Sequence, residues 1–595
     1  SEDFDVLKSR GVTLNGTIAI MRYGKGQTLA KIKRAEENGI QGVLIYADPF
    51  DTESLDTEVP SGPAVPSDAV ERGNIKSFPG DPVTPFLPAT DDIYRMPRSD
   101  VQLPGIPVQP ISAEDAQHLL QGIGGPSAPI RWQGRLNLSY NIGPGYKDAA
   151  EIEVQLSSFN LFREMNIYNV IGVIPGTHES GRYIIIGCHH DSWTKGAGDP
   201  GTGMAVLMEV ARMFSDLIRI EGWRPKRTLI FAAWDAAEFG QVGSTEFLQK
   251  HFGELSHRTV AYLSLDQAVT GNRSLQVIGS PLLRQVLSEA AEKVPSPGED
   301  QMANSDQNNK PPPPHQQSQS SSSAQHQPAE SLYSSWTRAQ PVLLNSRRGS
   351  VPEIIPPASG ADFVPFFQLL GVPIAHFQYV AGDGSTDYPP LRTVYDDFDY
   401  IVNFTDPGQH GMAALAQLIA ATALKLTDTL QLPVKATDYA DQISADFATF
   451  QRAQGDFFRT NHIRLDALSA AVKGFSATAK NFQEAFERSA KSEKTILSTL
   501  EEFNDRLLQL ERSFLLQAAY PRHLHSRHLL YGPDNEDSNK GTLFPHLVMA
   551  VRQARKRPIS PALSYVRENL SLVLNALRSA TGILDKSLLL KSDPV

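Results

Sequence analysis

The sequence predicts an α/β protein with a mainly parallel, buried sheet, preceded by a loop-rich domain and followed by a helical domain. Three observations predict this. Short apolar runs alternate with helical patterns between about residues 160 and 408, Pro and Gly are frequent before residue 155, and strand-like runs stop after residue 408. At roughly 100–200 residues per domain, a chain of 595 residues should fold as about three or four domains.

The central region, residues 156–428, carries the strand pattern. Its apolar runs are Val170–Ile174, Tyr183–Ile186, Thr228–Phe231 and Val260–Leu263, and its helical patterns include Gly203–Leu217 and Pro281–Lys293. Continuous apolar runs separated by helices are typical of a parallel sheet with helices on both faces.

The first domain, residues 1–155, is predicted to be rich in loops, with a strand at Gly42–Tyr46 and a helix around Thr28–Asn38. A low-complexity stretch near residues 295–330 interrupts the central region with four consecutive prolines, Pro311–Pro314, and a serine-rich run at Ser318–Ser323. Such a composition buries too little apolar surface to offset its ordering entropy, so we expect a disordered insertion. The alternative is a ligand for a proline-recognition domain.

Helical apolar spacing dominates the end of the chain, over His410–Thr427, Ile463–Arg488, Ile496–Gln517 and Pro561–Ser587. Residues 429–595 are therefore predicted to form a helical domain. The pattern alone fits a dimer surface and an intramolecular bundle equally well.

Charge and composition narrow the function classes. The net charge of -11 argues against a nucleic-acid-binding protein, which normally carries a basic face. No run of about 18 apolar residues is present, so the sequence predicts no membrane span. A single cysteine, Cys188, favours a reducing compartment. Five glycosylation acceptor patterns favour the secretory route instead, and they begin at Asn15, Asn137, Asn272, Asn403 and Asn569.

Polar residues follow three of the apolar runs directly. His189 and Asp191 follow the second run, with Asp199 in the next loop; Glu238 follows the third and Asp266 the fourth. The carboxyl ends of parallel strands share one edge of a sheet, so these side chains should converge there. Histidine nitrogen and carboxylate oxygen are suitable zinc ligands.

The stretch from Tyr168 to Asp266 resembles the M28 zinc-peptidase family of glutamate carboxypeptidase II, the N-acetylated-alpha-linked acidic dipeptidase-like proteins and the transferrin receptors. The likeness is carried by Tyr168–Gly172, His189–Trp193, Trp234–Asp235, Glu238–Gly240 and Gly243–Glu246, and outside this core by Arg22–Lys25, Arg72–Asn74, Leu510–Phe514 and Arg527–Tyr531. The resemblance implies an M28 phosphorylase/hydrolase-like sheet, a protease-associated (apical) domain and a C-terminal helical dimerisation domain.

The resemblance also implies site residues. His189, Asp199 and Glu238 match the ligands of one zinc ion, Asp199 matches the bridging ligand, Asp266 matches a ligand of the second zinc, and Asp191 matches the carboxylate that orients the histidine. The family's general base is replaced by Ala237, and the second zinc's histidine by Arg392, which has no lone pair for a metal. At most one zinc ion is expected.

The substrate and calcium positions match only in part. Arg22 and Asn74 match substrate-binding positions, whereas His376 and Gln378 stand where active members carry arginines. Thr84 and Glu246 match calcium positions, but Leu87 and Gln249 do not, so the match is too incomplete to predict a calcium ion.

These departures predict a catalytically inactive homologue that acts as a receptor-like or binding ectodomain, closest in character to an inactive dipeptidase-like member. The family implies a homodimer, and the ectodomain of a single-pass type II membrane protein whose anchor is not in this chain. The alternative is an active zinc-dependent exopeptidase with altered, non-glutamate specificity, favoured by the retained ligands.

Overall fold

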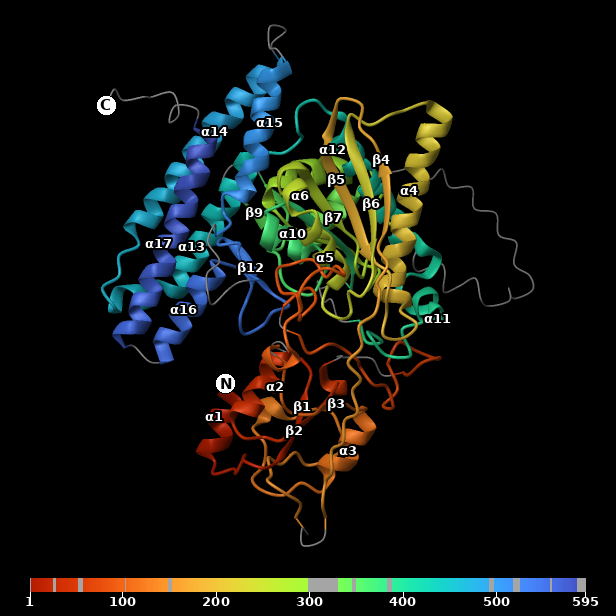
Figure 1. The fold of residues 1–595 in the computed structure, drawn as a ribbon, viewed down its shortest axis with the longest axis vertical. Helices are drawn as coiled ribbons and strands as arrows, with labels where there is room; N and C mark the ends of the chain where they lie inside the picture. The colour runs from red at the N-terminus through yellow and green to blue at the C-terminus, as the bar shows by residue number, and fades with distance from the viewer. Residues whose placement is uncertain are drawn as a thin grey trace, which may run out of the picture.

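A six-stranded sheet forms the centre of the molecule (Figure 1). The computed structural model describes residues 2–24, 28–51, 57–76, 78–101, 103–147, 152–297, 330–344, 349–381, 388–491, 497–516, 525–556 and 559–585. In spatial order the strands are β4 (Val170–Ile174), β6 (Arg227–Trp234), β5 (Glu179–His189), β7 (Thr259–Ser264), β11 (Ile374–Val380) and β8 (Ser274–Gly279). The four inner strands run parallel, and the edge strands β4 and β8 run antiparallel to their neighbours.

Two groups of helices flank this sheet. The first comprises α4 (Thr202–Glu221), α7 (Arg284–Ala291) and α12 (His410–Asp428), and the second comprises α5 (Val242–Lys250), α6 (Phe252–Arg258) and α10 (Phe363–Leu370). Strand β7 is buried along its whole length. The predicted α/β architecture with a mainly parallel sheet is confirmed.

The smaller elements of this region lie between the main helices and strands. They are α9 (Leu332–Ala339), the short helix α11 (Phe398–Tyr400), the hairpin of β9 (Pro341–Leu343) and β10 (Ser350–Pro352), and the single turn η6 (Pro281–Leu283).

The N-terminal part has its own parallel sheet and its own cores. Strands β1 (Ile18–Arg22), β2 (Gly42–Tyr46) and β3 (Val108–Pro110) pair in that order, beside α1 (Glu2–Ser9), α2 (Thr28–Glu37) and α3 (Ala113–Gln121). The predicted strand and helix of this region lie where the sequence placed them. In Figure 1 this part lies below the central sheet.

Long helices form the C-terminal part and lie beside the sheet (Figure 1). They are α13 (Ala436–Thr460), α14 (Asp466–Lys491), α15 (Leu497–Arg512), α16 (Pro545–Lys556) and α17 (Ser560–Leu584), with a small hairpin of β12 (Tyr531–Pro533) and β13 (Gly541–Leu543). One continuous hydrophobic core runs from Ile184 in the sheet to Leu584 in α17. The core therefore does not divide at residue 428, and the boundaries at 155 and 428 stay predictions.

The low-complexity insertion lies outside the described residues from 298 to 329. Its two ends meet, because Ser296 N donates to Glu330 O (2.8 Å) and Leu332 N donates to Val294 O (2.8 Å). In the described part of the chain, no helix is long and apolar enough to cross a membrane.

The glycosylation candidates differ in exposure. Asn15, Asn137 and Asn403 are exposed, and Asn272 is half-buried. The prediction for Asn569 is wrong, because this residue of α17 is only 2% exposed and its Nδ2 donates to Tyr565 O (2.9 Å). A side chain enclosed by its own helix bundle cannot carry a glycan in the folded chain.

Candidate active site

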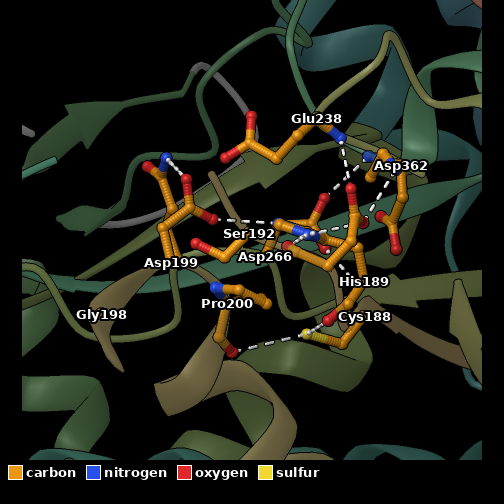
Figure 2. A network of polar contacts seen from close by, with 12 residues as sticks. Cys188, His189, Ser192, Gly198, Asp199, Pro200, Glu238, Asp266 and Asp362 are labelled. Atoms are coloured by element: carbon orange, nitrogen blue, oxygen red, sulfur yellow. Dashed lines mark hydrogen bonds and ion pairs between the residues drawn. The ribbon is translucent and has the colours of Figure 1, made fainter. Parts of the chain in front are cut away.

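The four predicted ligands come together at the carboxyl edge of the sheet (Figure 2). His189 is the last residue of β5, Glu238 lies in the turn after β6, and Asp266 follows β7 by two residues. Asp199 lies in the short π-helical turn η5 (Ala197–Gly201) that leads into α4. All four are buried, with exposures of 3–5%. The structure therefore brings these predicted residues into one cluster.

His189 is held by carboxylates on several sides. Its Nε2 lies 2.9 Å from Asp199 Oδ1, and its Nδ1 lies 3.0 Å from the backbone oxygen of Asp191 and 3.5 Å from Asp191 Oδ1. Burial alone would lower the pKa of His189, but Asp266, Asp191 and Asp199 outweigh it and raise this pKa well above its ordinary value. Asp191 also accepts hydrogen bonds from the backbone nitrogens of Ala237 (2.8 Å) and Glu238 (3.0 Å), as an orienting residue should.

Asp266 connects the cluster to a second buried network of hydrogen bonds. Its Oδ1 accepts from His189 N (3.1 Å), and its Oδ2 accepts from Asp362 N (2.8 Å). Asp362 accepts in turn from the hydroxyls of Tyr262 (2.6 Å) and Ser264 (2.7 Å). Burial, followed by the charge of Asp266, raises the pKa of Asp362 well above its ordinary value. Sequence reasoning assigned no role to Asp362, which positions Asp266.

Arg392 reaches into the cluster from the turn between β11 and α11. Its Nε lies 3.0 Å from Glu238 Oε2 and 3.3 Å from Glu238 Oε1. Among the described carboxylates of the cluster, Arg392 therefore forms its ion pair with Glu238. Burial would lower the pKa of Arg392, but Glu238 and Asp199 outweigh it and raise this pKa. Burial and the neighbouring Asp199 still leave the pKa of Glu238 above its ordinary value.

The side chain at residue 237 and the nearest acid in the same turn, Asp235, do not supply the missing base. The Ala237 side chain is a buried methyl group. The nearby Asp235 is already engaged, because its Oδ2 accepts from Tyr168 N (2.7 Å) and its Oδ1 from Ala236 N (2.8 Å). The Asp235 carboxylate is therefore held by the backbone of Tyr168 and of its own turn.

Two regions of this chain match models of known protein families. Residues 169–330 match the model of peptidase family M28, and residues 463–585 match the transferrin receptor-like dimerisation domain. Aminopeptidase NAALADL1 of Mus musculus is 35% identical over 600 residues, which cover 98% of this chain and 76% of that protein. The chain belongs to peptidase family M28.

Two more distant relatives illustrate the range of this family. A glutamate carboxypeptidase 2 homolog of Caenorhabditis briggsae is 29% identical over 611 residues, covering 97% of this chain and 75% of that protein. Transferrin receptor protein 2 of Homo sapiens is 29% identical over 548 residues, covering 92% of this chain and 62% of that protein.

The M28 zinc pair does not fit the residues as they lie. By the family resemblance, Arg392 takes the place of the second metal's histidine, and a guanidinium has no lone pair to give a metal. The carboxylate of Glu238 is paired with that guanidinium, and His189 and Asp199 are hydrogen-bonded to each other. Among the described residues, no group of three or more His, Cys, Asp and Glu side chains is placed so that it could hold a metal ion.

The residues at and around the family's calcium positions include both an acidic and a basic side chain. Glu246 in α5 accepts from the backbone nitrogens of Asp81 and Ala89, both at 2.7 Å. The Lys76 ammonium is hydrogen-bonded to Gly80 O, and burial, partly offset by Asp81 and Glu246, lowers the pKa of Lys76 to about 8. Within the described residues, Thr84 Oγ1 is buried without a hydrogen-bond partner. A lysine charge already lies beside Glu246, so we assign no calcium ion.

The substrate-binding candidates are engaged within the chain. Arg22 pairs with Asp51, and its Nη1 donates to Gln133 O (3.2 Å). Asn74 Nδ2 donates to Glu238 O (2.9 Å). His376 is buried beside Ser264 Oγ (3.0 Å), and burial lowers the pKa of His376 to about 4. The histidine is therefore neutral at physiological pH and offers no charge to an acidic substrate.

Two further carboxylates near the cluster were missed by sequence reasoning. Asp396 accepts from Gly198 N (2.6 Å) and Asp199 N (3.3 Å), so it fixes the turn that carries Asp199. Burial raises the pKa of Glu71 to about 7, against the opposing charges of Arg392 and Lys31. Neither residue follows a strand, and the only sequence clue to Glu71 is its place directly before the Arg72–Asn74 motif.

Proposed function

We propose that this chain is a non-catalytic M28 homologue that acts as a binding ectodomain. One observation carries the proposal: Ala237 stands at the base position, and Arg392 is paired with Glu238 beside it. A hydrolytic water needs a group that takes its proton and passes it to the leaving amine. The methyl group of Ala237 cannot do this, and the Asp235 carboxylate is bound to the backbone nitrogens of Tyr168 and Ala236.

The wild-type chain should therefore release no amino acid from a broad dipeptide panel. Losing a general base typically costs 10²–10⁴ in rate, and a disrupted metal site adds to that loss. The assay should be run with and without added zinc, with an active M28 aminopeptidase as positive control. Turnover by the wild type that follows the protein peak through purification would contradict the proposal.

The alternative function is an active exopeptidase with altered, non-glutamate specificity. It is favoured by the convergence of His189, Asp199, Glu238 and Asp266, and by Glu71, whose pKa near 7 suits a general base. At most one zinc ion would serve this chemistry. The variant Glu71→Gln tests this alternative. If Glu71 is the general base of an active peptidase, the variant should lose the turnover that the wild type shows.

We expect a homodimer formed through residues 429–595. The match of residues 463–585 to a transferrin receptor-like dimerisation domain supports this. Light scattering on the purified chain at micromolar concentration should give twice the chain mass of 65.2 kDa. A single monomeric species over that concentration range would refute the expectation. By the same family membership, we propose that the chain is the ectodomain of a type II membrane protein.

A further inference from the structure

The side chain of Arg392 is anchored through one nitrogen. Within the described residues its hydrogen bonds run from Nε to Glu238, and the side chain is 29% exposed. The backbone around it is fixed, because Arg392 O accepts from Arg72 N (3.3 Å) and the residue has a φ of 59°. A left-handed conformation is unfavourable for a residue with a side chain, and such strain persists where surrounding contacts hold it.

The cluster around Arg392 carries several buried acids. Asp199 and Glu238 are each 3% exposed, and Asp266 is 5% exposed. Buried carboxylates are costly unless a positive charge or hydrogen-bond donors compensate for them. In an M28 zinc peptidase the bound metal ions supply that positive charge. Among the described lysine and arginine side chains, the one ion-paired to this cluster is Arg392.

We infer that Arg392 is a built-in substitute for a metal ion: its guanidinium holds the acidic cluster together, so that the folded site needs no divalent cation. The role follows from geometry. Arg392 extends from the β11–α11 turn into the cluster, contacts Glu238 with Nε, and is tied through its backbone to the N-terminal part at Arg72. It therefore links three segments that are distant in sequence, as a shared metal would.

The surroundings of Lys76 show the same pattern at a second place. Its ammonium is hydrogen-bonded to Gly80 O, next to Glu246, whose carboxylate binds two backbone nitrogens of the 81–89 loop. There too, the positive charge beside a half-buried carboxylate comes from a side chain. The two side chains come from different loops, which both contact the Glu238–Gly240 turn.

The inference is tested by chelation and by Arg392→Met, which keeps most of the side-chain length and removes the charge. The wild type should contain far less than one zinc per chain by elemental analysis, and EDTA should not change its Tm. Arg392→Met should lower the Tm, and added zinc should raise the Tm of this variant but not that of the wild type. Arg392→Lys should keep most of the wild-type Tm, since it restores the charge.

Two controls separate charge loss at this site from general effects. Arg464→Met removes an arginine that is also ion-paired, to Asp466, but is 88% exposed, so its Tm should stay at the wild-type value. Adding Glu238→Gln to Arg392→Met should recover part of the lost stability, because the uncompensated carboxylate is then gone.

Stoichiometric zinc in the wild type, or a Tm that falls with EDTA, would overturn the inference. So would an Arg392→Met variant that melts like the wild type. If that variant fails to fold, the metal content and the chelation melt of the wild type still decide the question. These readouts do not depend on the proposed function. Peptide turnover by the wild type would contradict the proposed function instead.

Discussion

The double variant Ala237→Glu with Arg392→His should gain peptide hydrolysis far beyond the product of the two single effects. Ala237→Glu alone supplies a base, but Arg392 still places a positive charge beside Glu238. Arg392→His alone supplies a lone-pair donor, but a water in the cluster still lacks a proton acceptor. Groups that act as a unit are strongly non-additive, so only the double variant should rise above background, by about 10² or more.

The measurement is hydrolysis and zinc content for the wild type, both single variants and the double variant. The matched control is Ala237→Gln with Arg392→His, which has nearly the same volume and no base. Any gain should be on neutral dipeptides, since neutral His376 cannot hold a carboxylate as an arginine fork does. Equal activity of the Glu and Gln double variants would show that Ala237 is not what limits the chemistry.

Glu511→Ala should be among the most destabilising single substitutions in the chain. Glu511 in α15 is completely buried and accepts from Tyr439 OH (2.6 Å) and from His528 Nε2 (3.0 Å) through one oxygen. Its other oxygen accepts from Oγ of Ser280, the residue before η6. Removing the carboxylate leaves three buried donors unpaired and a cavity between the helices and the sheet region, at a cost of about 3–5 kcal/mol.

Denaturant unfolding of Glu511→Ala measures this loss. Glu484→Ala is the control, because Glu484 is exposed on α14 and its removal should change stability by less than about 0.5 kcal/mol. A double-mutant cycle with Tyr439→Phe should show strong coupling to Glu511. A Glu511→Ala variant as stable as Glu484→Ala would mean that water or relaxed packing satisfies the three donors.

The parallel strands at the sheet centre and the cluster at their carboxyl edge were accessible from sequence, because both are marked by local patterns, whereas the spatial order of the strands was not. The run Tyr183–Ile186 and the residues after it place His189 without any tertiary information. Helix α13 was missed: its buried aromatics, such as Phe447 and Phe450, are spread among polar residues, so no compact apolar run marks it.

The missing parts of the site were those set by long-range contacts. Asp362 is separated from Asp266 by 96 positions, and Arg392 from Glu238 by 154, so no spacing rule connects them. The sequence showed that Arg392 was unsuited to a metal, but only the direction of approach shows which carboxylate it takes. The sequence around Asn569 fits a glycosylation pattern, and only the packing of α17 shows that its side chain is buried.

The continuous core between the sheet and the C-terminal helices has a consequence for biosynthesis. The sheet region cannot complete its core until α13–α17 have been translated, because Phe514, Leu547 and Val566 belong to the same core as Ile185 and Leu263. At about 5–20 residues per second, residues 429–595 emerge over roughly 10–30 s. During that interval a nascent chain displays apolar surface at the ribosome, and a premature stop anywhere after α12 leaves a product that chaperones and proteases should treat as unfinished.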